Sequence, residues 1–467
     1  MTDLWGLRAH QIADLIRSRD LSCVEVVEAA LRRVDETNPA VNAIVDRLDD
    51  AALAQAKLVD STVSRGEAPK GSLVGVPFTA KLNSDYEGLA TTNGVRGFAD
   101  RIAARDNPCI GNLKRAGAIC IGRTNVPAFS ARYFTDNDLY GRTLNPWNPA
   151  ITPGGSSGGA AVSVAAGMVP IAHGNDRAGS IRYPAHVAGV FGIRPTVGRV
   201  PSHDATLGFE PTLGTQITNV QGCFARSIPE LRVAFEAMSA GDAADPNWIP
   251  AASSHRMKPR IGVLTRWPTG RIDPFNLDAV EAAAAALSGQ GFDVVDVEIP
   301  WLEEAGRLFW TLTTSEDAGH LHSLVERFGD RAIIQARRAA LTYVARVDTA
   351  AAYVALLQRR SALIRDFVER TQNTPVLVMP VALERPPAVD VDQQGDAAVH
   401  AMLRGFGPLT AISLLGLPSL AVPIGFEDGL PRGVQVVSGR FQEELCFAVG
   451  DAIALHDPVV WPSPQHG

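Results

Sequence analysis

Two short segments near the middle of the chain are crowded with glycine and serine. Residues 153–159 read PGGSSGG, and residues 174–182 read GNDRAGSIR. Glycine allows tight turns and a close approach of the backbone to other groups. A flexible linker would share this composition, but residues 160–167 continue directly in a pattern typical of a helix of small residues. The sequence therefore predicts an ordered turn region rather than a linker.

Around this centre, hydrophobic patterns predict strands and helices that alternate along the chain. Ser22 and Glu25 form a capping box, which predicts that a helix begins beside them. The expected strands cover residues 71–77 leading into 78–82, about 119–121, 261–264, 294–299, 375–380, 420–425 and 433–438. The expected helices include residues 160–167, 278–287 and most of 302–372. The strand–helix–strand order from 261 to 299 predicts parallel pairing, and the alternation as a whole predicts an α/β fold with a mixed sheet.

The chain has 467 residues, a length that would allow two or three domains. No internal repeat, low-complexity tract or long polar linker divides it. We therefore expect one large domain over residues 1–467.

Composition and charge exclude several classes of protein. Lys and Arg number 43 against 50 Asp and Glu, a net charge of −7, so no basic surplus is present to bind a phosphate backbone and nucleic acid is not expected as a partner. No run of 18 apolar residues occurs, and no basic segment followed by an apolar one opens the chain, so we expect neither a membrane span nor a secretion signal. The five cysteines are far apart and form no C-x-x-C pair, which indicates buried thiols in a reducing, cytoplasmic compartment rather than disulfides or a zinc site.

Two kinds of chemistry compete for the glycine-serine segments on local motifs alone. Glycine loops before helices can bind phosphate, but neither the P-loop pattern nor the dinucleotide pattern G-x-G-x-x-G can be written here. Residues 154–158 do satisfy the G-x-S-x-G elbow of α/β-hydrolases, with Ser156 as the nucleophile. That short pattern also requires an Asp and a His downstream, and many residues could supply them.

A second serine and an upstream lysine extend the pattern. Ser180 lies 24 residues after Ser156, and Lys81 ends the segment 75–81. With these residues the chain resembles the amidase signature family, whose catalytic triad is Ser–cis-Ser–Lys. Further matches follow in the family's order along nearly the whole chain, at residues 122–125, 145–148, 153–159, 179–182, 184–185, 192–196, 416–418 and 433–435.

The resemblance implies both a fold and a reaction. The implied fold is a single large domain with a mixed central β-sheet covered by helices on both faces, in which the helix-rich region at about 302–372 contributes to the substrate side. The implied reaction is hydrolysis of a carboxylic amide to an acid and an amine or ammonia, with no metal and no organic cofactor. The expected partner is a small-molecule amide, and the oligomeric state, a homodimer included, stays open.

The resemblance also implies roles for individual residues. Ser180 matches the nucleophile that forms the acyl-enzyme, Ser156 the bridging serine reached through a cis Gly155–Ser156 peptide, and Lys81 the base. The backbone N–H groups of the oxyanion hole belong to Arg177, Ala178, Gly179 and Ser180. The residues that brace this loop are Ser157, Asp176 and Arg182. Because an isolated lysine has a pKa near 10.4, Lys81 must be buried so that its amine is neutral at the working pH.

Some positions depart from the family pattern. Where the family commonly reads GTDxGGS, residues 174–180 read GNDRAGS, so Asn175 replaces Thr and Ala178 replaces Gly. The Ala178 replacement would strain the backbone if this position had a positive φ. Arg177 adds a charge that we expect to face solvent or a salt bridge. This wording, with His173 before it as a packed strand residue, resembles the aminohexanoate cyclic-dimer hydrolases.

Three alternatives remain open at this point. The chain could be the A-type subunit of a glutamine-dependent tRNA amidotransferase, which works within a complex. It could be an α/β-hydrolase esterase that uses Ser156. It could also be a non-catalytic binding protein descended from amidases, an interpretation suggested by the altered Arg177–Ala178 wording.

Overall fold

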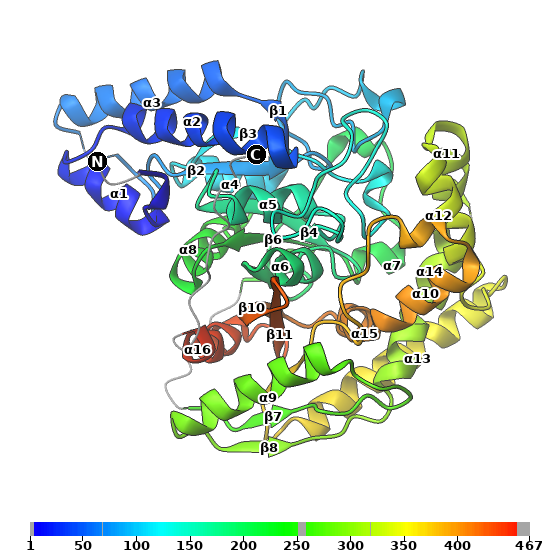
Figure 1. The fold of residues 1–467 in the computed structure, drawn as a ribbon. Coiled ribbons are helices and arrows are strands. Elements are labelled where there is room, and N and C mark those ends of the chain that lie inside the picture. The colour runs from blue at the N-terminus through cyan, green and yellow to red at the C-terminus, as the bar shows by residue number, and fades with distance from the viewer. Residues whose placement is uncertain (1–3, 68, 251–257, 318, 455–467) are drawn as a thin grey trace.

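A computed structural model describes residues 4–67, 69–250, 258–317 and 319–454 (Figure 1). Its strands are β1 (Ile44–Arg47), β2 (Pro77–Lys81), β3 (Ile119–Thr124), β4 (Ile171–Asp176), β5 (Phe191–Arg194), β6 (Val220–Ala225), β7 (Ile261–Val263), β8 (Val294–Asp296), β9 (Val376–Pro380), β10 (Ser419–Glu427) and β11 (Leu430–Ser438). Its helices are α1 (Ala9–Ser18), α2 (Cys23–Val41), α3 (Asp49–Ser64), α4 (Pro108–Arg115), α5 (Gly158–Ala165), α6 (Arg182–Ala188), α7 (Leu213–Gln216), α8 (Ile228–Met238), α9 (Pro274–Gly289), α10 (Leu302–Asp317), α11 (His320–Phe328), α12 (Arg331–Leu341), α13 (Ala350–Arg370), α14 (Asp396–Gly405), α15 (Gly407–Leu415) and α16 (Glu443–Ala454).

The eleven strands in the described part of the chain form one mixed sheet. Their order is β1-β3-β2-β4-β6-β5-β10-β11-β9-β7-β8, and Figure 1 shows the sheet running from β1 near the top to β8 at the bottom. The pairs β3–β2, β2–β4, β9–β7 and β7–β8 are parallel, and the remaining neighbours are antiparallel. The mixed α/β sheet that we predicted is thus confirmed, including the parallel pairing of β7 with β8.

Both faces of the sheet are buried under helices. Along β9, Val376 and Val378 join a core with residues of α9 and α16, whereas Leu377 and Met379 join a second core with residues of α10, α13 and α15. Successive side chains of a strand point to opposite faces, so two cores on alternate residues mean two covered faces. This arrangement explains why the strand is apolar at every position in the sequence.

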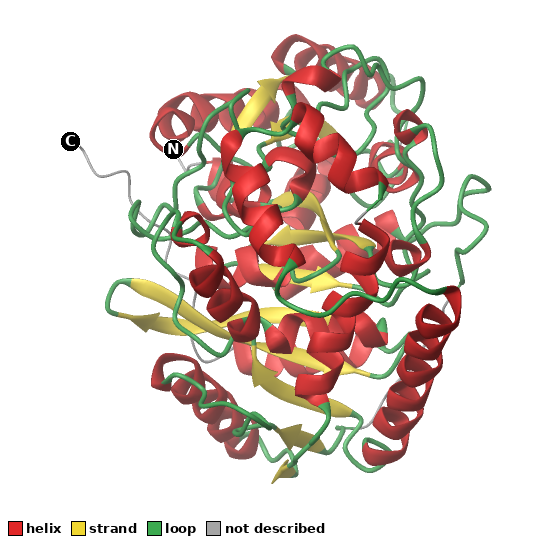
Figure 2. Ribbon diagram, turned by 90° about the vertical axis from the view of Figure 1, so that its right-hand side faces the viewer, coloured by secondary structure: helices red, strands yellow, loops and turns green. Residues whose placement is uncertain are grey.

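Most of the predicted elements are present. Ser22 caps α2 as expected: its Oγ accepts from the backbone N–H of Glu25, whose carboxylate accepts from the backbone N–H of Ser22. The region 302–372 holds four helices, α10 to α13, which lie on the right-hand side of Figure 1. Figure 2 views the molecule from that side, with helices in front of and beside the strands.

One predicted strand is wrong in its first part. Residues 71–76 form turns, and β2 begins only at Pro77. Gly71 has a φ of +105°, and Gly75 has a φ of +69°, conformations that a strand does not use. The apolar residues of this segment are buried in a compact turn, and their apolar composition alone does not distinguish such a turn from a buried strand.

Within the described ranges no single helix is long and apolar enough to cross a membrane. The bent pair α14 and α15 passes that length and composition test only when the two helices are taken together.

Candidate active site

Strands β2 and β4 bring the upstream lysine to the glycine-serine segments. The two strands pair in parallel at Phe78–Ile171 and Thr79–Ala172. At the end of β2 the hydrogen bond to β4 is made to a side chain: the backbone N–H of Lys81 donates to His173 Nδ1 over 3.2 Å. His173 Nδ1 must therefore be unprotonated, and its Nε2 donates to Gln221 Oε1 over 2.9 Å. The interpretation of His173 as a packed strand residue agrees with this arrangement.

The amine of Lys81 is enclosed at the end of β2. The side chain is 0% exposed, and its Nζ lies 2.8 Å from Ser156 Oγ and 2.6 Å from Asn175 Oδ1. Burial lowers the pKa of Lys81 well below 10.5, and the nearby charge of Asp176 only partly offsets this effect. A neutral amine in contact with a serine hydroxyl can accept a proton from it.

Ser156 lies in the turn that leads into α5. The expected cis peptide between Gly155 and Ser156 is present. A Cβ on Gly155 would lie 2.5 Å from the carbonyl oxygen of Arg132 and 2.8 Å from the carbonyl carbon of Tyr133, both backbone atoms. Only glycine therefore fits at this position. Ser157, the next residue, is buried and donates from its Oγ to the carbonyl oxygen of Asn175 over 3.3 Å, which joins the two glycine-serine segments.

A buried ion cluster braces the loop that follows β4. Asp176 accepts the side chain of Arg182 at 3.0 Å and that of Arg194 at 3.2 Å, and all three residues are fully buried. Burial alone would raise the pKa of Asp176, but the two guanidinium groups outweigh it and hold the pKa well below its usual range. Asp176 Oδ2 also accepts the backbone N–H groups of Ile181 and Arg182. The carboxylate thus fixes the backbone that follows Ser180.

The predicted oxyanion loop has a defined geometry. Ala178 does not have a positive φ, so alanine in place of glycine causes no backbone strain there. The carbonyl oxygen of Ala178 accepts the hydroxyl of Tyr133 over 2.7 Å. The N–H of Gly179 donates to Asp176 Oδ1 over 2.8 Å. Of the N–H groups we predicted for the hole, that of Gly179 is therefore already occupied.

Ser180 lies between the end of β4 and the start of α6. It is half-buried, whereas Ser156 is 2% exposed. Its Oγ makes no hydrogen bond to any residue in the described ranges. An accessible hydroxyl on a braced loop suits a nucleophile, and a buried hydroxyl against a lysine suits a proton carrier.

Arg177 is half-buried and close to the helical region. Burial of Tyr353 in α13 and its hydrogen bond to Glu316 raise the pKa of that tyrosine, and the charge of Arg177 acts in the opposite direction. Glu316 of α10 in turn accepts the backbone N–H of Gly214 over 2.7 Å. The charge of Arg177 thus acts on α13, and Ala178, the next residue, packs against the same apolar cluster as Trp310 of α10, in the region that we expected on the substrate side.

Sequence reasoning missed three contributors to the site. Arg194 stood in a matched motif without an assigned role, Asn175 was treated as a modest replacement, and Tyr133 was not singled out. The distances to their partners along the chain explain the omission, since Asn175 lies 94 residues from Lys81 and Tyr133 lies 45 residues from Ala178. No local spacing rule connects such pairs.

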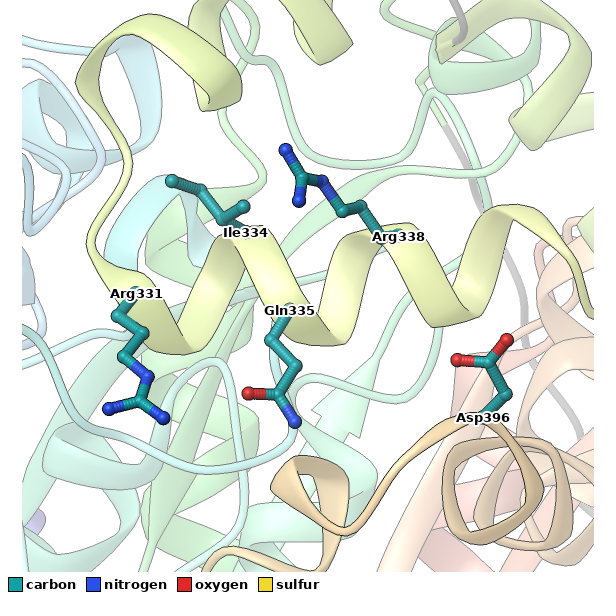
Figure 3. A pocket seen from close by; sticks show the side chains of 5 residues that line it. All are labelled: Arg331, Ile334, Gln335, Arg338 and Asp396. Carbon is teal, nitrogen blue, oxygen red and sulfur yellow. The ribbon is translucent and has the colours of Figure 1, made fainter.

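A separate surface hollow lies away from these residues. Figure 3 shows its lining, which consists of Arg331, Ile334, Gln335 and Arg338 from α12 and Asp396 from the start of α14. None of these side chains belongs to the cluster around Lys81. In the described part of the chain no group of three or more His, Cys, Asp or Glu side chains is arranged to hold a metal ion.

Comparison with known proteins identifies the family of the chain. The Amidase family model matches residues 25–447. The chain is 38% identical to the indoleacetamide hydrolase of Bradyrhizobium diazoefficiens, over 96% of this chain and 86% of that protein. It is 30% identical to the A-type subunit of the glutamyl-tRNA(Gln) amidotransferase of Halorhodospira halophila, over 94% of this chain and 95% of that protein.

The fold is shared with solved structures of the same kind. The structure of a 6-aminohexanoate cyclic dimer hydrolase in complex with its substrate superposes with a TM-score of 0.82 at 26% identity, over 99% of each chain. The chain belongs to the amidase family, and it is an enzyme that hydrolyses the carbon–nitrogen bond of a carboxylic amide.

Proposed function

We propose that this amidase works through an acyl-enzyme on Ser180, with Ser156 and Lys81 as its proton relay. The observation that carries the proposal is the contact between the buried amine of Lys81 and Ser156 Oγ, at 2.8 Å, beside the braced loop that presents Ser180. A buried lysine without a carboxylate partner is otherwise costly, so its place here calls for a chemical role.

The proton balance of the proposed reaction closes without a cofactor. Ser180 Oγ attacks the amide carbonyl, and its proton passes to Ser156, whose own proton passes to Lys81. The proton then returns through Ser156 to the amide nitrogen, the carbon–nitrogen bond breaks, and the amine leaves. Water attacks the Ser180 ester, gives its proton to the same relay, and the acid is released with the hydroxyl of Ser180 restored.

The oxyanion of the tetrahedral intermediate would be bound by backbone N–H groups of the loop before and at Ser180. The N–H groups of Ala178 and Ser180 donate to no residue in the described ranges, whereas that of Gly179 is bound to Asp176. We therefore assign Ala178 and Ser180 as donors, and a contribution from the N–H of Arg177 stays a prediction. Loss of one such donor typically costs about 10²- to 10³-fold in rate.

For the substrate we infer a small arylacetamide-like amide as the first class to test. The inference rests on the similarity to an indoleacetamide hydrolase and on half-buried aromatic side chains, Trp310 and Tyr343, that border the same apolar cluster as Ala178. A turnover screen against arylacetamides, primary aliphatic amides, anilides and cyclic amides tests it. We expect the highest kcat/KM for the arylacetamides, and a preference for another class would contradict the inference.

A second candidate function is that of the A-type component of a tRNA amidotransferase, because relatives of that name match 94% or more of the chain. Such a component works in a complex, so hydrolysis of simple amides by the purified chain alone would favour the independent amidase.

We further infer a cytoplasmic enzyme with a small-molecule partner and no nucleic acid, consistent with the net charge of −7. Light scattering of the purified chain tests whether it forms a homodimer, the oligomeric state that the sequence left open.

The central test is removal of the nucleophile. Ser180→Ala should reduce kcat by about 10⁴-fold or more while the circular dichroism spectrum stays unchanged, because only one half-buried oxygen is lost. Ser64→Ala, a serine on the exposed face of α3, is the matched control and should keep full activity. Wild-type-like turnover by Ser180→Ala would refute the assignment. A serine-directed phosphonate should label Ser180, and an adduct on Ser156 would contradict the assignment of the nucleophile.

A further inference from the structure

Asn175, which replaces a threonine of the common family wording, lies against a second asparagine, Asn83, beside Lys81. Asn175 Nδ2 donates to Asn83 Oδ1 over 2.9 Å, and Asn83 Nδ2 approaches Asn175 Oδ1 at 3.4 Å. Asn175 Oδ1 is also the atom 2.6 Å from Lys81 Nζ. Asn175 is 8% exposed, so little water competes for these contacts.

The chemistry of an amide decides the direction of each hydrogen bond. An amide oxygen only accepts, so the amine of Lys81 must donate a hydrogen to Asn175. A neutral amine then keeps its lone pair for its other close partner, the hydroxyl of Ser156. Asn83 Oδ1 likewise only accepts, which holds the Nδ2 of Asn175 on its side and the Oδ1 of Asn175 on the side of Lys81.

The charge around Lys81 gives the asparagine pair a second consequence. The charged and titratable groups that act on Lys81 are Asp176 and His173 of β4. Asp176 already forms ion pairs with Arg182 and Arg194, and His173 Nδ1 carries no proton because it accepts the backbone N–H of Lys81. An uncharged amide thus contacts the amine without adding a negative charge that would hold a proton on it.

We propose that Asn175, held in place by Asn83, is a positioning residue that directs the lone pair of Lys81 toward Ser156 while leaving the amine uncharged. This proposal rests on the relay given above. Asn175 and Asn83 act through Lys81 and do not themselves exchange a proton with the substrate.

The first test introduces a carboxylate at the same place. Asn175→Asp should move the acidic limb of the kcat/KM profile to higher pH by about one unit or more, because a negative charge within contact distance favours the protonated amine. Activity should recover at alkaline pH. Asn148→Asp adds the same charge at an exposed turn, where Asn148 Oδ1 accepts the backbone N–H of Ala150, and should leave the profile unchanged. An Asn175→Asp profile equal to the wild-type profile would overturn the proposal.

The second test removes the oriented acceptor. Asn175→Leu and Asn83→Leu should each lower kcat by about 10- to 100-fold with little change in KM, since the amine loses its fixed orientation. The double variant should be no worse than Asn175→Leu, because both changes remove the same contact. Additive losses, or an unchanged kcat in a folded Asn175→Leu, would count against the pair.

The outcome for Lys81 separates this inference from the proposed function. If Lys81→Ala keeps activity, the relay itself is wrong. If Lys81→Ala is inactive and both Asn175 variants behave like the wild type, the relay stands and the positioning role of Asn175 is wrong.

Discussion

Lys81 and the residues around it show how single side chains create the site. An exposed lysine carries a charge at neutral pH, and burial at the end of β2 lowers its pKa well below 10.5. The departures from the common family wording at Asn175 and Ala178 leave the site intact in different ways. Asn175 supplies an oxygen to the amine, and Ala178 adopts a backbone conformation that any residue tolerates.

Tyr133 is a residue-scale contributor that can be tested by a change of one atom. Its hydroxyl donates to the carbonyl oxygen of Ala178 and so orients the peptide next to Ser180. Tyr133→Phe should lower kcat about fivefold, equivalent to one hydrogen bond of about 1 kcal/mol, with the fold unchanged. Steady-state kinetics measure the effect; an unchanged kcat would show that the loop holds its shape without this bond.

At the scale of elements, the site depends on a few buried polar ties. Arg182, the first residue of α6, donates to Asp176 of β4, to Gln435 of β11, and to the carbonyl oxygen of Leu409 and the Oγ of Ser413 in α15. Arg194 of β5 adds a further contact to Asp176. These contacts hold together elements that lie far apart in the sequence.

Asp176→Asn tests the ion cluster directly. The variant leaves two buried guanidinium groups without their counter-charge, and we expect the free energy of unfolding to fall by about 3–5 kcal/mol. Asp14→Asn is the matched control, because Asp14 pairs with Arg17 on an exposed face of α1 and should contribute little. Urea unfolding of both variants measures the difference, and equal losses would contradict a special role for the buried cluster.

On the scale of the whole molecule, buried neutral histidines make the fold sensitive to acid. Burial lowers the pKa of His173 and of His186 from 6.5 to about 4. Between these pH values the unfolded chain binds protons that the folded chain excludes. The contribution of these two histidines to the free energy of unfolding is therefore fully present above about pH 6.5 and is lost as the pH falls toward 4.

His186→Leu should flatten this dependence. Neither ring nitrogen of His186 has a hydrogen-bond partner in the described ranges, so removal of the ring leaves no other polar group unpaired. We expect the loss of unfolding free energy between pH 7 and pH 5 to shrink by about 2 kcal/mol relative to the wild type. Denaturant unfolding at the two pH values measures it, and the same pH dependence in both proteins would show that His186 is not the source.

Much of the local structure could be predicted from the sequence. Capping residues such as Ser22 and apolar runs such as residues 375–380 report on contacts within a few positions, and the helix α2 and the strand β9 follow them. Residues 71–76 were misread because a buried turn and a short buried strand have the same apolar composition. The positive φ of Gly71 and Gly75 separates the two, and φ is a property of the folded backbone.

The sequence alone was sufficient for the α/β alternation, for the glycine turns and for the identity of Lys81, Ser156 and Ser180 as candidates. The alternation and the turns rest on local propensity and motifs, which act over short stretches of chain, and the three candidate residues rest on the resemblance to the amidase signature family. The order of the sheet decided the rest. Because β2 lies next to β4, Lys81 meets Ser156 and Asn175, which are 75 and 94 residues away along the chain. The burial that lowers the pKa of Lys81, and the choice of Asn175 as its partner, follow from packing between distant segments, which local propensity does not specify.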